Sequence, residues 1–264
     1  MDRARLRLLE RIHRSYVTTT QSVRIGDRSL SFTRIADPDR VLDQVAAQAD
    51  LQERLSGKRQ GDEQLHLPYW AELWDSAMGI GQYLAENWDT KPRGRGDAGK
   101  EKSLDSNRSF SASPRLGVSA SPLSVLDLGC GMGLSGTVAA ALGANVLFAD
   151  IEPPALLFAR LNSLPWAERV RTRRLNWQRD CLSERFDLII GADILYERAQ
   201  WEYQEPFLAG HLIAGGTVLL GEPGRQTGDL YIDWIRQRAW ALEISLETVP
   251  TRQTPVRILR LSRL

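Results

Sequence analysis

The segment 125–136 holds the residues of this chain whose types and spacing best suit chemistry. An apolar run from Val125 to Leu128 carries one carboxylate, Asp127, and leads into a turn with glycine at positions 129, 131, 133 and 136. Glycine in such a turn lets the backbone come within contact distance of a ligand, and a helix that starts after it offers free N–H groups. The pattern predicts a strand, a ligand-binding turn and a helix from about residue 134.

Asp127 indicates which ligand the turn binds. The glycine spacing also suits a dinucleotide, so by itself it leaves a nicotinamide or flavin cofactor open. A carboxylate at the end of the strand would repel a pyrophosphate, but it suits S-adenosylmethionine, which carries an ammonium and a sulfonium group and no phosphate. We therefore expect S-adenosylmethionine as the cofactor, with a tight turn that binds nothing as the structural alternative.

A second acid follows at the spacing that a nucleoside site requires. Asp150 ends the short apolar segment 145–149. In a βαβ unit, an acid at this place accepts hydrogen bonds from the ribose hydroxyls. Asp150 could also cap the helix that is expected from Pro153, and the two roles are compatible.

Composition narrows the classes of protein. The chain has 264 residues, 42% of them hydrophobic, which suits one large α/β domain with a modest extension. A net charge of +1 gives no sign of a nucleic-acid or membrane partner, and no apolar run is long enough to span a bilayer. Two cysteines and three scattered histidines predict no metal site and a reducing compartment. We expect a cytoplasmic monomer.

Residues 1–60 are predicted to form a small N-terminal extension. A helix is expected to about Ser15, a β-hairpin around Gly26 and Asp27, and a second helix from Asp39 to Leu55. The spacing of five apolar residues predicts one inner face on the second helix. These residues are Val41, Leu42, Val45, Leu51 and Leu55.

The main domain, 61–264, contains a segment of different composition. Residues 91–122 are rich in Lys, Arg, Gly, Ser and Asp, and Phe110 is their single aromatic residue. Such a segment cannot bury enough apolar surface to offset its ordering entropy. We expect a flexible insertion, although its basic residues leave contact with RNA or an acidic partner open.

Strand and helix patterns alternate through the rest of the domain. The strands are expected at about 123–129, 145–150, 170–175, 186–192, 215–221, 241–248 and 255–262. The helices are expected at about 134–142, 153–163, 200–211 and 227–238. Repeated βα units predict a doubly wound, seven-stranded and mostly parallel α/β sheet, and the last two strands, which no helix separates, predict a C-terminal antiparallel hairpin.

Four segments of this domain together resemble one family. They are the aromatic segment 68–77, the glycine turn 127–136, Leu175-Asn-Trp177, and the segment 187–196 that ends in Asp-Ile-Leu-Tyr. They are similar to family 16 of the class I (seven-β-strand) methyltransferases, which is best known for protein-lysine methyltransferases. The likeness covers residues 65–90 and 123–262, and it implies a Rossmann-like fold that uses S-adenosylmethionine.

The resemblance assigns residues to the cofactor. It places the turn glycines at the methionine end, Asp150 at the ribose, Asn176 and Trp177 at the adenine, and Trp74 over the site from the N-terminal side. The predicted cofactor residues are thus Trp74, Asp127, Gly129, Gly131, Gly133, Asp150, Asn176 and Trp177. Core packing remains the alternative for Trp70 and Trp74, because aromatic residues at i and i+4 share one helix face.

Asp193 and Tyr196 are the predicted catalytic pair. They follow the fourth strand, and open α/β sheets bind ligands at the carboxyl ends of their strands. We expect Asp193 to orient an amine and Tyr196 to hydrogen-bond it, while Trp70 and Tyr196 form an aromatic wall for the methylated cation. A helix cap and a buried tyrosine are the structural alternative.

The acceptor is less closely defined. Amino-adenine DNA methyltransferases need Asn/Asp-Pro-Pro-aromatic where this chain has Asp-Ile-Leu-Tyr, so a nucleobase is disfavoured. The resemblance implies N-methylation of a protein lysine. A small-amine N-methyltransferase and a cofactor-binding protein without catalysis remain as alternatives.

Overall fold

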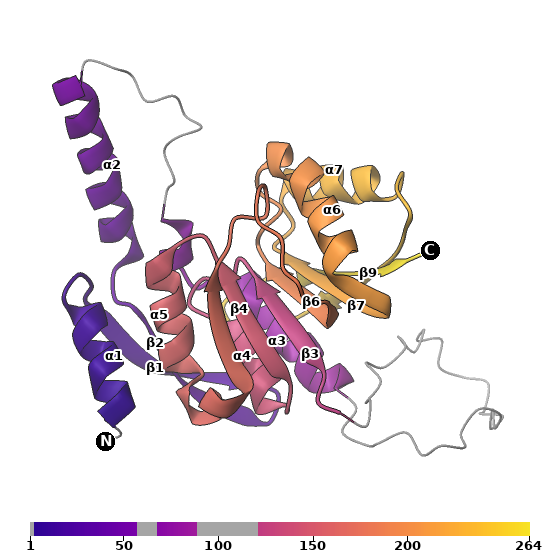
Figure 1. Ribbon diagram of the computed structural model, residues 1–264, viewed down its shortest axis with the longest axis horizontal. Helices are drawn as coiled ribbons and strands as arrows, with labels where there is room; N and C mark the ends of the chain where they lie inside the picture. Colours follow the sequence, from indigo (N-terminus) through magenta and orange to yellow (C-terminus); the bar gives the residue numbers. More distant parts are fainter. Residues whose placement is uncertain (1–2, 57–67, 89–120) are drawn as a thin grey trace.

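The computed structural model describes residues 3–56, 68–88 and 121–264. Its centre is a seven-stranded sheet in the order β5-β4-β3-β6-β7-β9-β8 (Figure 1). The strands are β3 (Ser124–Leu128), β4 (Asn145–Asp150), β5 (Val170–Arg174), β6 (Phe186–Ala192), β7 (Leu212–Glu222), β8 (Trp240–Glu247) and β9 (Val256–Arg263). Strands β3 to β7 run parallel, and β9 is antiparallel to both β7 and β8. The predicted α/β fold, with its C-terminal hairpin, is confirmed.

Helices cover both faces of the sheet, which explains why the inner strands are almost continuously apolar. In β3, Val125 faces one layer and Leu126 the other, as alternation along a strand requires. The first layer contains α3 (Asp75–Asn87), α4 (Leu134–Ala141) and α5 (Pro153–Asn162), and the second contains α6 (Trp201–His211) and α7 (Gln226–Ile235). The carboxyl ends of the parallel strands lie at the same edge of the sheet, and the loops after β3, β4, β6 and β7 meet there.

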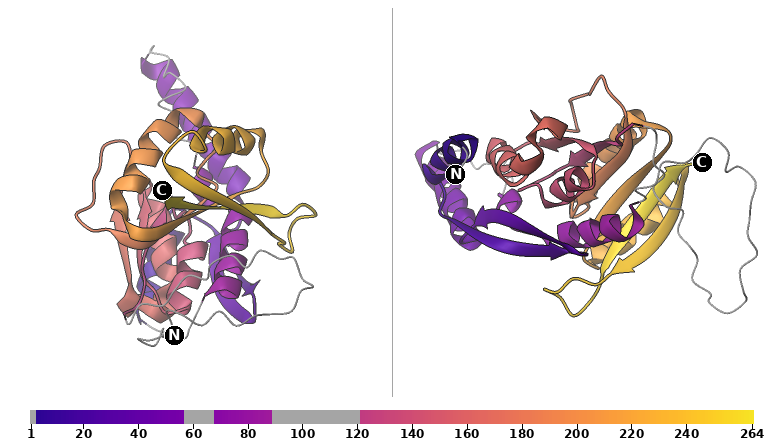
Figure 2. Two further views of the ribbon diagram at one scale, coloured as in Figure 1. Left: turned by 90° about the vertical axis from the view of Figure 1, so that its right-hand side faces the viewer. Right: turned by 90° about the horizontal axis from the view of Figure 1, so that it is seen from below.

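The N-terminal residues pack on the first layer. They form α1 (Arg3–His13), the hairpin β1 (Thr18–Ile25) and β2 (Arg28–Ile35), and α2 (Pro38–Ser56). Helix α1 lies against α5, and the hairpin runs along the outside of the domain to α3 (Figure 2). Ile12, Ile25 and Phe32 are fully buried in the same core as Phe158 of α5. The helix, hairpin and helix expected from the sequence are therefore present.

Asn162, at the end of α5, connects this hairpin to the glycine turn. Its Oδ1 accepts a hydrogen bond from the Thr33 N–H at 2.8 Å. Its Nδ2 donates to the carbonyl oxygens of Thr33 and Met132, both at 3.0 Å. These bonds satisfy buried backbone groups of two segments that lie far apart in the sequence.

Helix α2 corrects one prediction. Leu51 and Leu55 were expected on an inner face, but their side chains are 56% and 79% exposed. Figure 1 shows the C-terminal part of α2 projecting away from the sheet, which agrees with the exposure of these two side chains. Val41, Leu42 and Val45, nearer the start of the helix, are half-buried.

Two predictions concern segments that the structure describes only in part. The boundary between the extension and the main domain falls within 57–67, outside the described residues, and the insertion at 91–122 does so too, apart from its last two residues. Within the described ranges, no helix is both long and apolar enough for a membrane span. The same ranges contain no cluster of three or more His, Cys, Asp or Glu side chains placed to bind a metal.

Candidate active site

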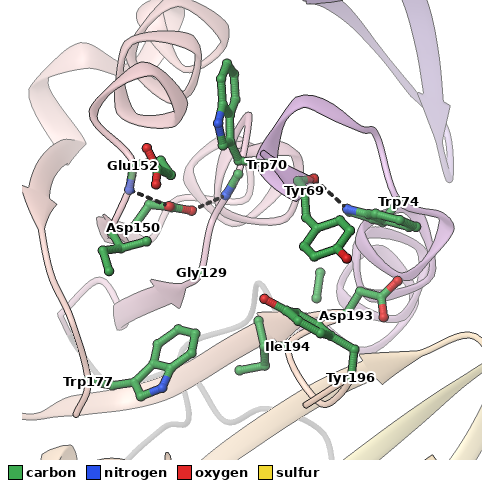
Figure 3. Close-up of a pocket in the computed structure, with 13 residues that line it drawn as sticks. Tyr69, Trp70, Trp74, Gly129, Asp150, Glu152, Trp177, Asp193, Ile194 and Tyr196 are labelled. Carbon is green, nitrogen blue, oxygen red and sulfur yellow. Dashed lines mark hydrogen bonds between the residues drawn. The ribbon is translucent and has the colours of Figure 1, made fainter. Parts of the chain in front are cut away.

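A pocket lies at the carboxyl ends of β3, β4 and β6 (Figure 3). Its walls come from five segments: the 3-10 helix η2 (Tyr69–Ala71) with the start of α3, the glycine turn, the end of β4, the loop after β5, and the end of β6. All five belong to stretches that the sequence singled out. The pocket therefore brings together most of the predicted site residues.

The glycine turn follows a path that requires glycine. Gly129, Gly131 and Gly133 have φ angles of 62°, 51° and 83°, in the left-handed region that other residues rarely adopt. Gly129 and Gly131 line the pocket, whereas Gly133 lies beneath it, where an added Cβ would come within 2.7 Å of the Ala159 Cβ. Of the three predicted glycines, two reach the pocket and the third allows α5 to pack closely.

Asp127 lies below the turn and does not line the pocket. Its side chain is almost completely buried, and its Oδ2 accepts a hydrogen bond from the Gly136 N–H at 2.8 Å. Burial raises the pKa of Asp127 to about 8. Burial therefore favours the uncharged form of this carboxyl group, whereas the sequence argument assumed a charged one. Asp127 instead holds the start of α4 beneath the turn.

Asp150 lines the pocket and fastens the turn. Its Oδ2 accepts from the Gly131 N–H at 2.8 Å and its Oδ1 from the Glu152 N–H at 2.9 Å (Figure 3). Burial raises its pKa to about 6, against these two hydrogen bonds. The N-cap position of α5 is occupied by Glu152, not Asp150, and the Glu152 side chain makes no capping hydrogen bond. Glu152 also lines the pocket, and sequence reasoning did not include it among the site residues.

The two residues predicted at the adenine lie differently. Trp177 lines the pocket next to Gly129, and its Nε1 donates to the Gln200 Oε1 at 3.0 Å. Asn176 is not part of the pocket wall, and its Oδ1 accepts from the Gln178 N–H at 2.9 Å. The amide thus stabilises the loop that carries the indole.

Aromatic side chains form the wall toward η2 and β6. Trp70 is buried, with its ring centroid 5.4 Å from that of Tyr16 and 5.9 Å from that of Phe158. Trp74 is half-buried and donates from Nε1 to the Tyr69 carbonyl oxygen at 2.9 Å. The two tryptophans do not share a helix face, because Trp70 lies in η2 and Trp74 precedes α3.

Tyr196 closes this wall. Its ring centroid lies 5.4 Å from that of Tyr69 in an edge-on arrangement, and both side chains line the pocket. Although 45% of Tyr196 is exposed, desolvation at the pocket raises its pKa above the ordinary value of 10, and its hydroxyl is protonated at neutral pH. Sequence reasoning missed Tyr69, although it stands beside Trp70 in the aromatic segment that was noted.

Asp193 has a backbone conformation that is unusual for a residue with a side chain. Its φ angle is 56°, and among the described residues no other non-glycine residue has a positive φ. Such a conformation costs free energy and concentrates at functional sites. The side chain is 5% exposed; its Oδ1 accepts from Arg225 Nη1, and its Oδ2 is buried without a hydrogen-bond partner. An uncompensated carboxylate oxygen is thus held beside the pocket.

Arg225 was not predicted from the sequence. Its guanidinium carbon lies 5.3 Å from the centre of the Trp74 ring. Arg225, Trp74, Tyr69, Asp193 and Tyr196 line a second cavity that shares four of these residues with the first pocket. The available signal was its place three residues after β7, because β7 ends at the same sheet edge as β6.

The chain is similar to known proteins over most of this site. The lysine methyltransferase family matches residues 63–229. The electron transfer flavoprotein beta subunit lysine methyltransferase of Rattus norvegicus is 30% identical over 164 residues, which are 60% of this chain and 51% of that protein. The protein N-lysine methyltransferase METTL21A of Danio rerio is 39% identical over 109 residues, which are 36% of this chain and 47% of that protein.

The matches cover different shares of this chain and of the proteins it is similar to. The chain spans about half the length of the curated relatives it matches. A solved structure, that of the glycopeptide N-methyltransferase MtfA, has a TM-score of 0.48 at 13% identity and covers 54% of this chain and 84% of that one. The family match covers more than half of the chain and contains every residue that lines the pocket. The chain therefore belongs to the lysine methyltransferase family, whose cofactor is S-adenosylmethionine.

Proposed function

We propose that this chain methylates the side-chain amine of a lysine in a protein substrate. The observation that carries the proposal is the buried, unpartnered Oδ2 of Asp193, beside a cavity walled by aromatic rings. Aromatic rings with a nearby carboxylate suit a lysine or methyl-lysine side chain, whose cation and apolar stem they can both contact. The family match supports lysine as the acceptor.

The pocket residues fit S-adenosylmethionine. Gly129 and Gly131 expose backbone without side chains, which suits the methionine end. Asp150 and Glu152 supply acceptors for the ribose hydroxyls, and Trp177 offers a ring for the adenine. When bound, the cofactor supplies a methyl group that its sulfonium already activates.

The acceptor side of the pocket has two tasks, to position the amine and to exclude water. Asp193 Oδ2 accepts an N–H of the amine, and the Tyr196 hydroxyl offers a second hydrogen bond. The rings of Tyr69 and Trp74 shield the amine from solvent. A lysine with its ordinary pKa must also lose a proton, which costs about 4 kcal/mol at pH 7.5.

The cellular setting is part of the proposal. Cys130 and Cys181 are free thiols, which is typical of a reducing compartment, and we propose that the chain acts in the cytoplasm as a monomer.

Label transfer tests the function. Incubating the protein with tritiated S-adenosylmethionine and host lysate should label discrete protein bands, and acid hydrolysis should release the label as methyl-lysine. Asp193→Ala should lower the labelling rate at least about a hundredfold, the size expected for losing a positioning group, whereas Tyr196→Phe keeps the ring and should cost less. Calorimetry should show that both variants bind S-adenosylhomocysteine as the wild type does.

If the label were found only in small molecules, the acceptor would be a small amine and not a protein lysine. Absence of any transfer, with intact binding, would leave a cofactor-binding protein.

A further inference from the structure

The pairing of Asp193 with Arg225 bears directly on how the acceptor amine loses its charge. An isolated buried carboxylate next to a lysine favours the ammonium form, because an opposite charge within about 4–6 Å stabilises the charged state. The ammonium form has no lone pair with which to attack the methyl carbon of the donor. A bare Asp193 would therefore hold the amine in its unreactive form.

Arg225 changes this balance. Its Nη1 donates to Asp193 Oδ1, so the carboxylate already has a counter-charge, and Oδ2 remains as a hydrogen-bond acceptor. An amine bonded to Oδ2 lies on the other oxygen of the same carboxylate, close to the guanidinium. A like charge at that range disfavours the ammonium.

The chain holds Arg225 firmly in this position. The Glu222 side chain accepts from the N–H groups of Gly224 and Arg225 at 2.9 and 3.2 Å, which fixes the turn after β7. The guanidinium lies over the Trp74 ring, a favourable arrangement for a planar cation. An arginine is suited to this role because it stays protonated at every pH at which a protein is folded.

The other two charged groups whose field acts on Asp193, Glu222 and Arg252, have partners of their own. Glu222, at the end of β7, is bound by Arg257 of β9. Arg252, in the loop between β8 and β9, pairs with Asp75 of α3 at 3.7 Å. The remaining carboxylates that line the pocket or adjoin Tyr196 are Asp150, Glu152 and Glu197. In the described part of the chain, Arg225 is the one cation bonded to Asp193.

We propose that Arg225 is a positioning residue that neutralises Asp193, so that the carboxylate orients the acceptor amine while the amine stays uncharged. This inference rests on the proposed lysine methylation and adds to it the source of the neutral nucleophile. The Arg225 side chain is 39% exposed, so solvent screens its field, and we expect an effect of about one pH unit, the low end for a close charge.

The test is the pH dependence of the transfer rate. The acceptor is one batch of host lysate, and label is counted in a band that the wild type methylates, at saturating donor from pH 6.5 to 10. Arg225→Gln should move the rising limb of the profile upward by about one pH unit, giving a roughly tenfold lower rate at pH 7.5 and a near-wild-type rate at high pH. Arg225→Lys keeps the charge and should restore most of the wild-type profile.

Two further variants sharpen the result. Arg198→Gln removes an exposed arginine two residues after Tyr196 and should leave the profile unchanged, which controls for overall charge. Asp193→Asn should transfer methyl groups slowly, but the rising limb of its pH profile should lie at lower pH than in the wild type. The reason is that the Arg225 guanidinium then acts on the amine without a carboxylate beside it. Calorimetry with S-adenosylhomocysteine checks that each variant is folded and binds the donor site.

The outcomes separate this inference from the function beneath it. If the wild type labels no protein lysine, the proposed function fails. If the wild type labels protein and Arg225→Gln has an unshifted profile, or a rate lowered equally at every pH, only the role of Arg225 is overturned.

Discussion

At the scale of single residues, the acids at the strand ends divide into those that border the pocket and one that supports it from below. Asp150 and Asp193 line the pocket, whereas Asp127 is buried under the glycine turn. All three were found from the sequence, because an acid at the end of an apolar run stands out. Their positions differ because the path of the turn, not the sequence pattern, decides which side chain lines the pocket.

Replacing Asp127 by Asn tests its buried state. Asn keeps an oxygen for the Gly136 N–H but cannot ionise. The native pKa of Asp127 is about 8, above the ordinary 3.8, so the folded protein binds this proton more tightly than the unfolded chain. The wild type therefore loses stability from this group as the pH rises, by up to about 1.4 kcal/mol per pH unit, and the variant does not.

Urea unfolding from pH 5 to 8 measures this difference. The free energy of unfolding of Asp127→Asn, relative to the wild type, should grow across the series. Asp150, whose pKa burial raises to about 6, is retained in both proteins, so the difference reports Asp127 together with its interaction with Asp150. Parallel pH profiles would mean that Asp127 is ionised in the folded protein.

At the scale of elements, prediction succeeded where burial dictates the sequence. Strands β3, β4 and β6 lie between two layers of helices, and their apolar runs predicted strand bounds close to those observed. It failed where the partner comes from a distant element. Arg225, in the loop after β7, bonds to Asp193, after β6, and Glu152 lines the pocket from the N-cap position of α5. The place of each residue just after a strand can be read from the sequence, but its contact partner cannot.

Helix α2 provides a test of burial. An apolar spacing predicted that Leu51 and Leu55 face inward, yet both are exposed. Changing both to Gln should alter the free energy of unfolding by no more than about 0.5 kcal/mol per site, as for other surface positions. Phe32→Ala, in the buried hairpin, is the control and should cost about 3–5 kcal/mol. Denaturant unfolding would measure both, and a large loss in the α2 variant would show that the two leucines are covered in solution.

At the scale of the whole molecule, the N-terminal residues and the methyltransferase sheet share one core. Ile12, Ile25 and Phe32 are buried with α5, and Tyr16 packs on Trp70 of the pocket wall. The arginine-rich composition of this region gave no hint of such packing, because its few apolar residues carry the contact. The proposed division into an extension and a main domain therefore describes the order along the chain, while the packing joins the two.

The three hydrogen bonds of Asn162 have a thermodynamic consequence. A ligand that binds only to the intact glycine turn opposes any fluctuation that breaks the hydrogen bond between Asn162 and Met132. Because Asn162 also bonds to Thr33, the same ligand opposes the opening of β2 at Thr33. Linkage is reciprocal: if the cofactor slows hairpin opening, an intact hairpin tightens cofactor binding by the same free energy. At about a hundredfold excess over Kd the stabilisation reaches about 2.7 kcal/mol.

Amide hydrogen exchange can measure this linkage. Saturating S-adenosylhomocysteine should slow exchange of the Thr33 N–H, and Asn162→Ala should abolish that slowing. Gln82→Ala is the matched control, since Gln82 ties the same hairpin to α3 by accepting from the Gly26 N–H at 2.9 Å. It should speed exchange in the hairpin yet keep the response to ligand, whereas an equal response in all three proteins would mean that hairpin and turn open independently. If the slowing is seen in the wild type and lost only in Asn162→Ala, the exchange rate of one amide in the N-terminal hairpin reports whether the donor site is filled.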